Sequence, residues 1–404
     1  MESARLIAGL ARMVRDIGVA EELAQDALVA ALEQWPGSGI PRNPGAWLMA
    51  AAKHRAIDHL RRNKMLDRKH EHLGQEMEAR EKAVPDLAAM MDDGIGDDLL
   101  RLIFTACHPV LSAEARVALT LRLLGGLSTQ EVARAFFVPE ATMAQRIVRA
   151  KRILAVKEVP FEVPRGDEIS ARLASVLEVI YLIFNEGYAA AAGEDWVRPA
   201  LCQEAMRLGR LMTELAPREA EVHGLMSLME IQASRLRART GANGEPVLLL
   251  DQDRSRWDWL LIWRGLAALD RALRLGGRPG VYVLQAGIAA CHARARMADQ
   301  TDWRRIAELY AELADLTRSP VVELGRAMAV GMAYGAEQGL RVADALVSEP
   351  AMRNSHRLPS VRGDLLLKLG RRQEARREFK RAAELALNTA ERQMLLDRME
   401  ECAE

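Results

Sequence analysis

The segment "LSTQEVARAFFVPEATMAQRIVRAKRIL", residues 127–154, is typical of two short amphipathic helices with almost nothing between them. Ser128 and Glu131 form a capping box, in which each side chain accepts a hydrogen bond from the other residue's backbone N–H at the start of the first helix. Pro139 suits the first position of the second helix, where its missing N–H removes no hydrogen bond. The segment therefore predicts a tight corner between two helices.

The second helix of this corner combines one apolar stripe with polar faces. Because Met143, Ile147, Ala150 and Leu154 recur at helical spacing, we expect them to be buried. In a helix-turn-helix, the start of the second helix contacts base edges while flanking Arg and Lys residues hold phosphates. The alternative for this corner alone is an ordinary helical hairpin with a solvated basic face. The candidates for DNA contact are Glu140, Thr142, Gln145, Arg146, Arg149, Lys151 and Arg152.

The composition predicts an all-α protein with more than one domain. A chain of 404 residues is too long for one ordinary core, so we expect two or three domains. Hydrophobic residues make up 50% of the chain and aromatic residues only 4%, with abundant Ala, Leu, Arg and Glu. These residues favour helix, and Val and Ile nowhere form the alternating runs of a β-hairpin.

Charge is strongly segregated along the chain, although the formal net charge is zero and the pI is about 7.1. The average argues against nucleic-acid binding. However, residues 53–69 are basic, residues 71–98 are acidic, and residues 146–157 are basic again. Such blocks are an electrostatic footprint of nucleic-acid binding even when their sum vanishes.

Several classes of protein are not expected. The four cysteines form no CxxC pair, so we predict no disulfide framework, metal site or cofactor. Arg5, Arg12 and Arg15 interrupt the first apolar stretch, which argues against a signal peptide, and no apolar run is long enough to span a bilayer. We expect a soluble cytoplasmic protein without membrane contact. A phosphate-binding loop and a nucleophile–base pair are both missing, so we predict no enzyme.

Three further features are interpreted as structural. Cys107 and His108 are expected to form a packed, partly buried pair at a helix start. The aspartates of "DQDRSRWD" (251–258) lack the glycine and the terminal glutamate of a calcium loop. The aromatic run "WDWLLIW" (257–263) has helical spacing and is expected to belong to a core.

Breaks in the hydrophobic pattern divide the chain into several parts. Two segments rich in proline, glycine or acidic residues separate helical regions, and a loop with three prolines and two glycines covers 36–44. The predicted parts are two small helical domains at 1–70 and 97–158, an acidic linker at 71–96, a short linker at 159–169, and a helical extension at 170–404.

The end of the extension has the spacing of a tetratricopeptide helix pair, in which small residues let two helices approach and bulky ones fill the groove. The earlier copy is degenerate and lies 36 residues upstream, near the expected period of about 34. The packing positions are Gly363, Leu366, Ala375, Phe379 and Ala382 in one copy, and Ala327, Val330, Gly339, Ala343 and Leu346 in the other.

Three motifs in this order give the chain a resemblance to a known family. "AEELAQDALVAALEQW" (20–35), "PGAWLMAAAKHRAIDHLRRNK" (44–64) and the corner at 127–154 resemble the extracytoplasmic-function (ECF) sigma factors of bacterial RNA polymerase. "NEGYAA" (185–190) and "LLLDQDRSRWD" (248–258) resemble the branch with a large tetratricopeptide-like C-terminal extension. One departure is Phe137, which stands where this helix-turn-helix usually has glycine.

The resemblance implies a sigma factor that binds core RNA polymerase and directs promoter-specific transcription initiation. By this resemblance the corner contacts the −35 element, the loop 36–44 accepts a flipped base of the −10 element, and the linker 71–96 enters a polymerase channel. The resemblance also implies that the extension is regulatory. Because the linker before the extension is short, we further expect the extension to contact the sigma domains within the chain. The −10 phosphate contacts would be Lys53, Arg55, Arg61 and Arg62, and the polymerase contacts Glu22, Gln25, Asp26 and Glu33.

One alternative remains open at this point. The chain would then be an ordinary DNA-binding transcriptional regulator, or a scaffold, with a tetratricopeptide interaction domain. Residues 18–62 argue for the sigma factor, because a repressor has no use for both a polymerase-docking helix and a −10 helix.

Overall fold

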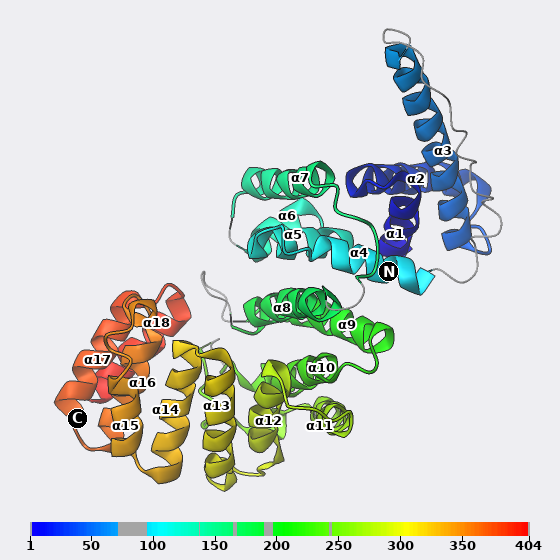
Figure 1. Cartoon of the computed structure of the whole chain (residues 1–404). Helices are drawn as coiled ribbons and strands as arrows, with labels where there is room; N and C mark the ends of the chain where they lie inside the picture. Colours follow the sequence, from blue (N-terminus) through cyan, green and yellow to red (C-terminus); the bar gives the residue numbers. More distant parts are fainter. Residues whose placement is uncertain are drawn as a thin grey trace. The chain divides into compact units, whose positions relative to one another are not determined.

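The computed structural model describes residues 2–71, 95–136, 138–164, 168–189, 197–241 and 245–402. Within these ranges every regular element is a helix, and the β-type pairing is an isolated bridge between Thr240 and Pro246 (Figure 1). The all-α prediction is confirmed. The chain forms two compact units, Met1–Val179 (unit 1) and Ile180–Glu404 (unit 2), so the division falls inside one helix, α8.

Unit 1 holds the predicted corner and the helices before it. Pro36 lies inside the last turn of α2, so the loop after this helix is shorter than the predicted 36–44. Most of the predicted acidic linker, as well as Phe137, lies outside the described residues. The helices are α1 (Glu2–Val14), α2 (Ile17–Ser38), α3 (Pro44–Glu71), α4 (Ile95–Ala106), α5 (Ala113–Leu123), α6 (Thr129–Ala135), α7 (Glu140–Val156) and α8 (Glu168–Tyr188).

The first half of α8 is hydrogen-bonded to the end of α4. A helix leaves its last carbonyl groups without intrahelical donors, so they need other partners when buried. The guanidinium of Arg172 donates to the Phe104 carbonyl at 2.9 Å, and the Ser175 hydroxyl donates to the Cys107 carbonyl at 2.6 Å. Arg116 of α5 also pairs with Glu178 at 3.0 Å. Residues up to Val179 of α8 therefore belong to the packing of unit 1.

A buried carboxylate joins three helices of unit 1. Glu21 of α2 has a side chain that is only 7% exposed, and it pairs with Arg122 of α5 at 2.7 Å and with Lys151 of α7. Gln25, one turn further along α2, donates a hydrogen bond to the same carboxylate at 3.2 Å. A charge removed from water is tolerated only with close partners, so this cluster fixes α2 against α5 and α7.

Unit 2 is a succession of helices, and α12 to α18 pack side by side in chain order (Figure 1). Its α-helices after α8 are α9 (Pro199–Leu215), α10 (Ala220–Ala233), α11 (Trp259–Arg274), α12 (Val281–Arg294), α13 (Trp303–Thr317), α14 (Pro320–Tyr334), α15 (Ala336–Asp344), α16 (Arg357–Lys368), α17 (Arg372–Leu385) and α18 (Thr389–Glu401). Short 3-10 turns lie at Leu236–Ala238, Arg254–Arg256, Ala298–Gln300 and Pro350–Met352.

The predicted repeat positions occupy the interfaces of two helix pairs, α14–α15 and α16–α17. A Cβ added to Gly363 would lie 2.8 Å from the Phe379 ring, so only glycine lets the helices approach this closely. Ala327, Ala343, Ala375 and Ala382 are fully buried, as expected for small packing residues. Val330 differs in being half-buried and packing toward the core between α12, α13 and α14.

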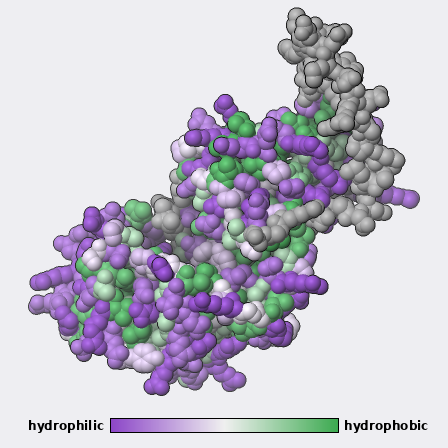
Figure 2. All heavy atoms as spheres, in the orientation of Figure 1, coloured by the Kyte–Doolittle hydropathy of each residue, from purple (hydrophilic) through white to green (hydrophobic). Residues whose placement is uncertain are grey.

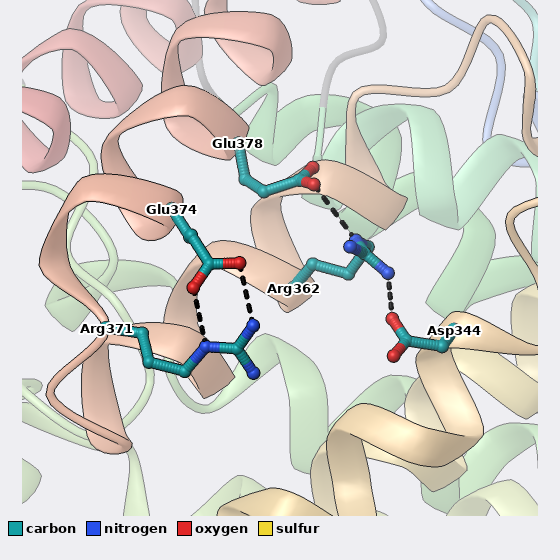
Figure 3. A network of polar contacts seen from close by, with 5 residues as sticks. All are labelled: Asp344, Arg362, Arg371, Glu374 and Glu378. Atoms are coloured by element: carbon teal, nitrogen blue, oxygen red, sulfur yellow. Dashed lines mark hydrogen bonds and ion pairs between the residues drawn. The ribbon is translucent and has the colours of Figure 1, made fainter.

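Ion pairs connect these successive helices (Figure 3). Arg362 of α16 bridges Asp344 of α15 and Glu378 of α17, the latter at 3.1 Å. A further pair is local to the start of α17, where Arg371 forms a bidentate ion pair with Glu374, with both N···O distances 2.7 Å. Pairs of this kind at the surface contribute little each, so the apolar interface carries most of the stability.

The visible surface is largely hydrophilic, with scattered apolar side chains between the polar ones (Figure 2). The expectation that the aromatic run 257–263 belongs to a core is only half right. Trp257 is buried, but Trp259 and Trp263 of α11 are 53% and 68% exposed. The helix presents its buried face through Ile262 and directs the two tryptophans to its other side.

The Glu21 cluster leads to a prediction about local stability. Glu21→Gln removes the negative charge that neutralises both Arg122 and Lys151 within this cluster. The free energy of local opening of α7 should therefore fall by about 2 kcal/mol, and its amide hydrogens should exchange roughly 30-fold faster. Hydrogen exchange of the full chain, followed by mass spectrometry, measures this change. The control is Glu22→Gln, which makes the same substitution at the exposed neighbouring residue. Equal protection of α7 in both variants would contradict a structural role for the cluster.

Candidate nucleic-acid interface

The corner between α6 and α7 is built as predicted at its start. The backbone N–H of Ser128 donates to the Glu131 carboxylate at 2.7 Å, and the N–H of Glu131 donates to the Ser128 hydroxyl at 3.2 Å. The capping box is therefore confirmed. Pro139 lies one residue earlier than predicted, because its ψ of 141° is extended and makes it the cap that precedes α7. The helix itself begins at Glu140.

Helix α7 is anchored by the stripe that its sequence predicts. Met143, Ile147, Ala150 and Leu154 are its buried residues, which confirms the prediction. The remaining candidates lie on the other faces of the helix. Five of them are exposed, Glu140, Thr142, Gln145, Arg149 and Arg152, whereas Arg146 and Lys151 are half-buried.

The two half-buried cations face acidic partners inside unit 1. Lys151 pairs with the buried Glu21 carboxylate, and its own side chain is 22% exposed. Arg146 lies near Glu114 of α5. Hydrogen bonds from the backbone of Glu114 and from Ser112 lower the Glu114 pKa, and Arg146 lowers it further. In this arrangement the freely exposed basic side chains of α7 are thus Arg149 and Arg152.

The predicted polymerase contacts lie on the outer side of α2. Glu22, Gln25, Asp26 and Glu33 are all exposed, while the opposite side of the helix is buried through Leu23, Ala24, Ala27 and other apolar residues. Asp16 caps the start of α2 by accepting a hydrogen bond from the Val19 N–H at 3.0 Å. The helix therefore presents a row of acidic groups to solvent, and Gln25 lies at the edge of this row with its amide bonded to Glu21.

The loop between α2 and α3 is short and well defined. Gly39 ends α2 with a φ of 81°, a conformation that favours glycine, and its N–H donates to the Trp35 carbonyl at 2.9 Å. Asn43 caps α3 through the Ala46 N–H at 3.1 Å. At the base of the loop, the rings of Trp35 and Trp47 meet edge to face, with centroids 5.6 Å apart.

This tryptophan pair was not among the predicted site residues. Its two members flank the loop rather than lie in it, and on a helix each is expected to be an ordinary apolar packing residue. Aromatic residues on both sides of a proline- and glycine-rich segment were the available signal, because rings are the surfaces on which unstacked bases pack.

The predicted −10 phosphate contacts follow the loop on α3. Lys53 and Arg55 are half-buried and Arg61 is exposed. Arg62 lies in the helical part of α3, but its side chain is outside the described residues. The role assigned to each of these residues stays a prediction.

The remaining candidates for chemistry have structural explanations. Cys107 is buried, and burial raises the pKa of its thiol to about 11, which makes it a poor nucleophile. The Cys107–His108 pair follows the end of α4 and does not begin a helix. Asp258 caps α11 by accepting from the N–H groups of Leu260 and Leu261. Among the described residues no acidic, His or Cys group has a metal-binding arrangement, and none of the described helices is long and apolar enough to cross a membrane.

Comparison with known families and proteins agrees with this geometry. Residues 2–65 match sigma-70 region 2, and residues 101–154 match sigma-70 region 4. Residues 172–273 match a family of unknown function (DUF6596). The chain is also 44% identical to an uncharacterized protein of Rhizobium meliloti (strain 1021) over 384 residues, which covers 95% of this chain and 89% of the relative.

The two matched sigma-70 regions correspond to the two helical parts of unit 1, and the third match begins in α8. The order of the motifs, the helix-turn-helix of α6 and α7 and the long helical extension agree with these matches. The chain belongs to the ECF-type sigma factors of transcription initiation and carries a C-terminal extension.

Proposed function

We propose that the protein binds core RNA polymerase through the exposed face of α2 and directs it to promoters through α3 and α7. The observation that carries this is the recognition helix, which is anchored by a buried stripe and keeps Gln145, Arg149 and Arg152 exposed. Such side chains suit a major groove, where amide and guanidinium groups pair with base edges and flanking cations with phosphates.

The −10 element is assigned to the loop between α2 and α3. A single-stranded base enters a site by leaving its stack, and it then needs a flat surface and exposed polar groups. Trp35 and Trp47 provide rings beside the loop, and Lys53 and Arg55 follow on α3. Arg61, which is exposed further along the same helix, is a candidate for a phosphate contact, and Arg62 is a candidate from the sequence alone.

Lys151 can contact a DNA phosphate only if it exchanges its present ion-pair partner. Its amine is paired with Glu21, so it reaches DNA only when that ion pair opens. A phosphate group is an equivalent anionic partner, so exchange of a carboxylate for a phosphate keeps the amine neutralised. Arg152, which is exposed, needs no such exchange.

The extension is proposed to be a tetratricopeptide-like regulatory domain that contacts the sigma domains. Support comes from the small residues at the α14–α15 and α16–α17 interfaces and from the bonds of Arg172 and Ser175 to the end of α4. Stacked helix pairs of this type form extended surfaces for protein or peptide ligands. The protein is proposed to act in the cytoplasm, where its polymerase is.

Binding to core polymerase tests the proposed function directly. The full chain should coelute with core RNA polymerase in size-exclusion chromatography. Asp26→Arg should weaken the complex at least tenfold, which corresponds to about 1.4 kcal/mol, because it reverses an exposed charge on α2. Glu337→Arg, an equivalent reversal on the exposed side of α15, is the control and should bind normally.

The free protein should bind duplex promoter DNA weakly in a mobility-shift assay at physiological salt. Its net charge is zero, and Glu21 and Glu114 face two of the α7 cations. Tight and sequence-specific binding without polymerase would favour an ordinary transcriptional regulator over a sigma factor.

Variants of α7 should separate base contacts from phosphate contacts. Gln145→Ala and Arg149→Ala should each change the difference in binding free energy between two promoters by about 1–3 kcal/mol. Arg152→Ala should instead weaken binding to all promoters alike and lower the slope of log affinity against log salt concentration by about 1. Binding of the holoenzyme to two promoters over a salt series measures both quantities. Lys157→Ala, just beyond the end of α7, is the control. If all three changes weakened binding to both promoters equally, this division of roles would be contradicted.

Truncation after Leu154 should lower run-off transcription from the protein's own promoter. It removes α8, which leaves the Phe104 and Cys107 carbonyls without their donors and uncovers the end of α4. In the full chain, Ser175→Val should act in the same direction but more weakly, and Ser170→Val on the exposed side of α8 is its matched control. Full activity of the truncated protein would mean that the extension has no role in initiation.

A further inference from the structure

Unit 2 contains a cavity of about 370 Å³ between α8, α10, α12, α13 and α14. Its apolar wall includes Leu228, Ile288 and Leu313, and the rings of Tyr181 and Tyr310 add flat surfaces. This volume falls within the range of small-molecule binding sites, which are mostly apolar with a few polar groups.

The cavity contains a buried guanidinium without an acidic partner. Arg235, which follows α10, is only 6% exposed and lines the cavity, and its Nε has no hydrogen-bond partner. It forms no ion pair within the described part of the chain. Its near neighbours are instead the rings of Tyr188 and Trp257, each with its centroid 5.9 Å from the guanidinium carbon.

The charged groups that the described residues place near Arg235 are two further arginines. Arg254 lies close enough to affect the same region, but its guanidinium is already bonded to the His292 and Ala295 carbonyls at 2.7 and 2.5 Å. Arg239 stacks on Tyr188 with 3.9 Å between its guanidinium carbon and the ring centroid. Burial first, and then repulsion by Arg239, lower the pKa of Arg235.

A second orphan polar atom belongs to the same cavity. His292 of α12 is 7% exposed, lines the cavity, and has an Nδ1 without a hydrogen-bond partner. Burial, together with Arg235 and Arg254, lowers its pKa to about 3, so the ring is neutral at pH 7. The positive charge of the cavity therefore resides on the arginine, and Gln232, Gln285 and Ser319 add amide and hydroxyl groups to the lining.

We propose that this cavity is the binding site of a small organic carboxylate with an apolar or aromatic body. Buried charges in proteins are paired, and Arg235 has a flat fork of donors that matches a carboxylate. The apolar wall and the two tyrosines would enclose the body of the ligand. A free inorganic anion would leave that wall empty, and a neutral molecule would leave the guanidinium unpaired.

Thermal unfolding of the full-length protein tests this, with benzoate as the probe. Sodium benzoate at about 10 mM should raise the midpoint by roughly 2–4 °C relative to sodium chloride at the same ionic strength. Benzamide, which has the same shape without the charge, should leave the midpoint unchanged. Arg235→Met should abolish the benzoate shift, while Arg237→Met, an exposed arginine two residues away, should keep it.

Arg235→Met should also fold without ligand, because it removes an unpaired buried charge and keeps an unbranched apolar chain. If it does not, Gln285→Glu supplies the second variant, since it places a resident carboxylate in the same cavity. That variant should raise the midpoint without benzoate and respond no further to it. The proposal is overturned if benzoate does not raise the midpoint of the unaltered protein or if benzamide raises it equally. It is also overturned if the benzoate shift persists in Arg235→Met or Gln285→Glu.

Discussion

The carboxylate of Glu21 lies buried between the guanidinium of Arg122 and the amine of Lys151, and the arrangement of unit 1 depends on it. One cation comes from α5 and the other from α7, the second helix of the corner proposed to contact DNA, whereas Glu21 comes from the helix proposed to bind polymerase. An ion pair withdrawn from water has few acceptable geometries. The exposed face of α2 and helix α7 are therefore held in one arrangement by a side chain that belongs to neither of the two proposed binding surfaces.

Local features of unit 1 were predictable because their partners lie within a few residues. The capping box of Ser128 and Glu131 and the buried stripe of α7 each follow from spacing on a single helix. The start of α7 was displaced by one residue, because a proline serves equally as the residue before a helix or as its first residue. Such displacements move no side chain from one face to another.

The interactions that the sequence did not predict join residues that are far apart in the chain. Glu21 finds its partners more than a hundred residues away, so its own segment gives no sign of the two cations that neutralise it. The same holds for the cavity around Arg235, whose lining comes from five helices of unit 2. By contrast, Gly363 and Phe379 belong to one helix pair, so the repeat spacing identified their contact. Periodicity shows which face of a helix is buried, but not which group lies opposite it.

The position of α8 limits how the extension can be exchanged between sigma factors. Residues 172–179 of the matched extension family supply Arg172 and Ser175, the donors for two carbonyl groups at the end of α4. The seam between sigma factor and extension is thus not the proline-containing linker at 159–164 but the surface of a helix. An extension transplanted to another sigma factor would need an α4 terminus that fits these two donors. Grafting at the linker alone joins the chains without restoring that fit.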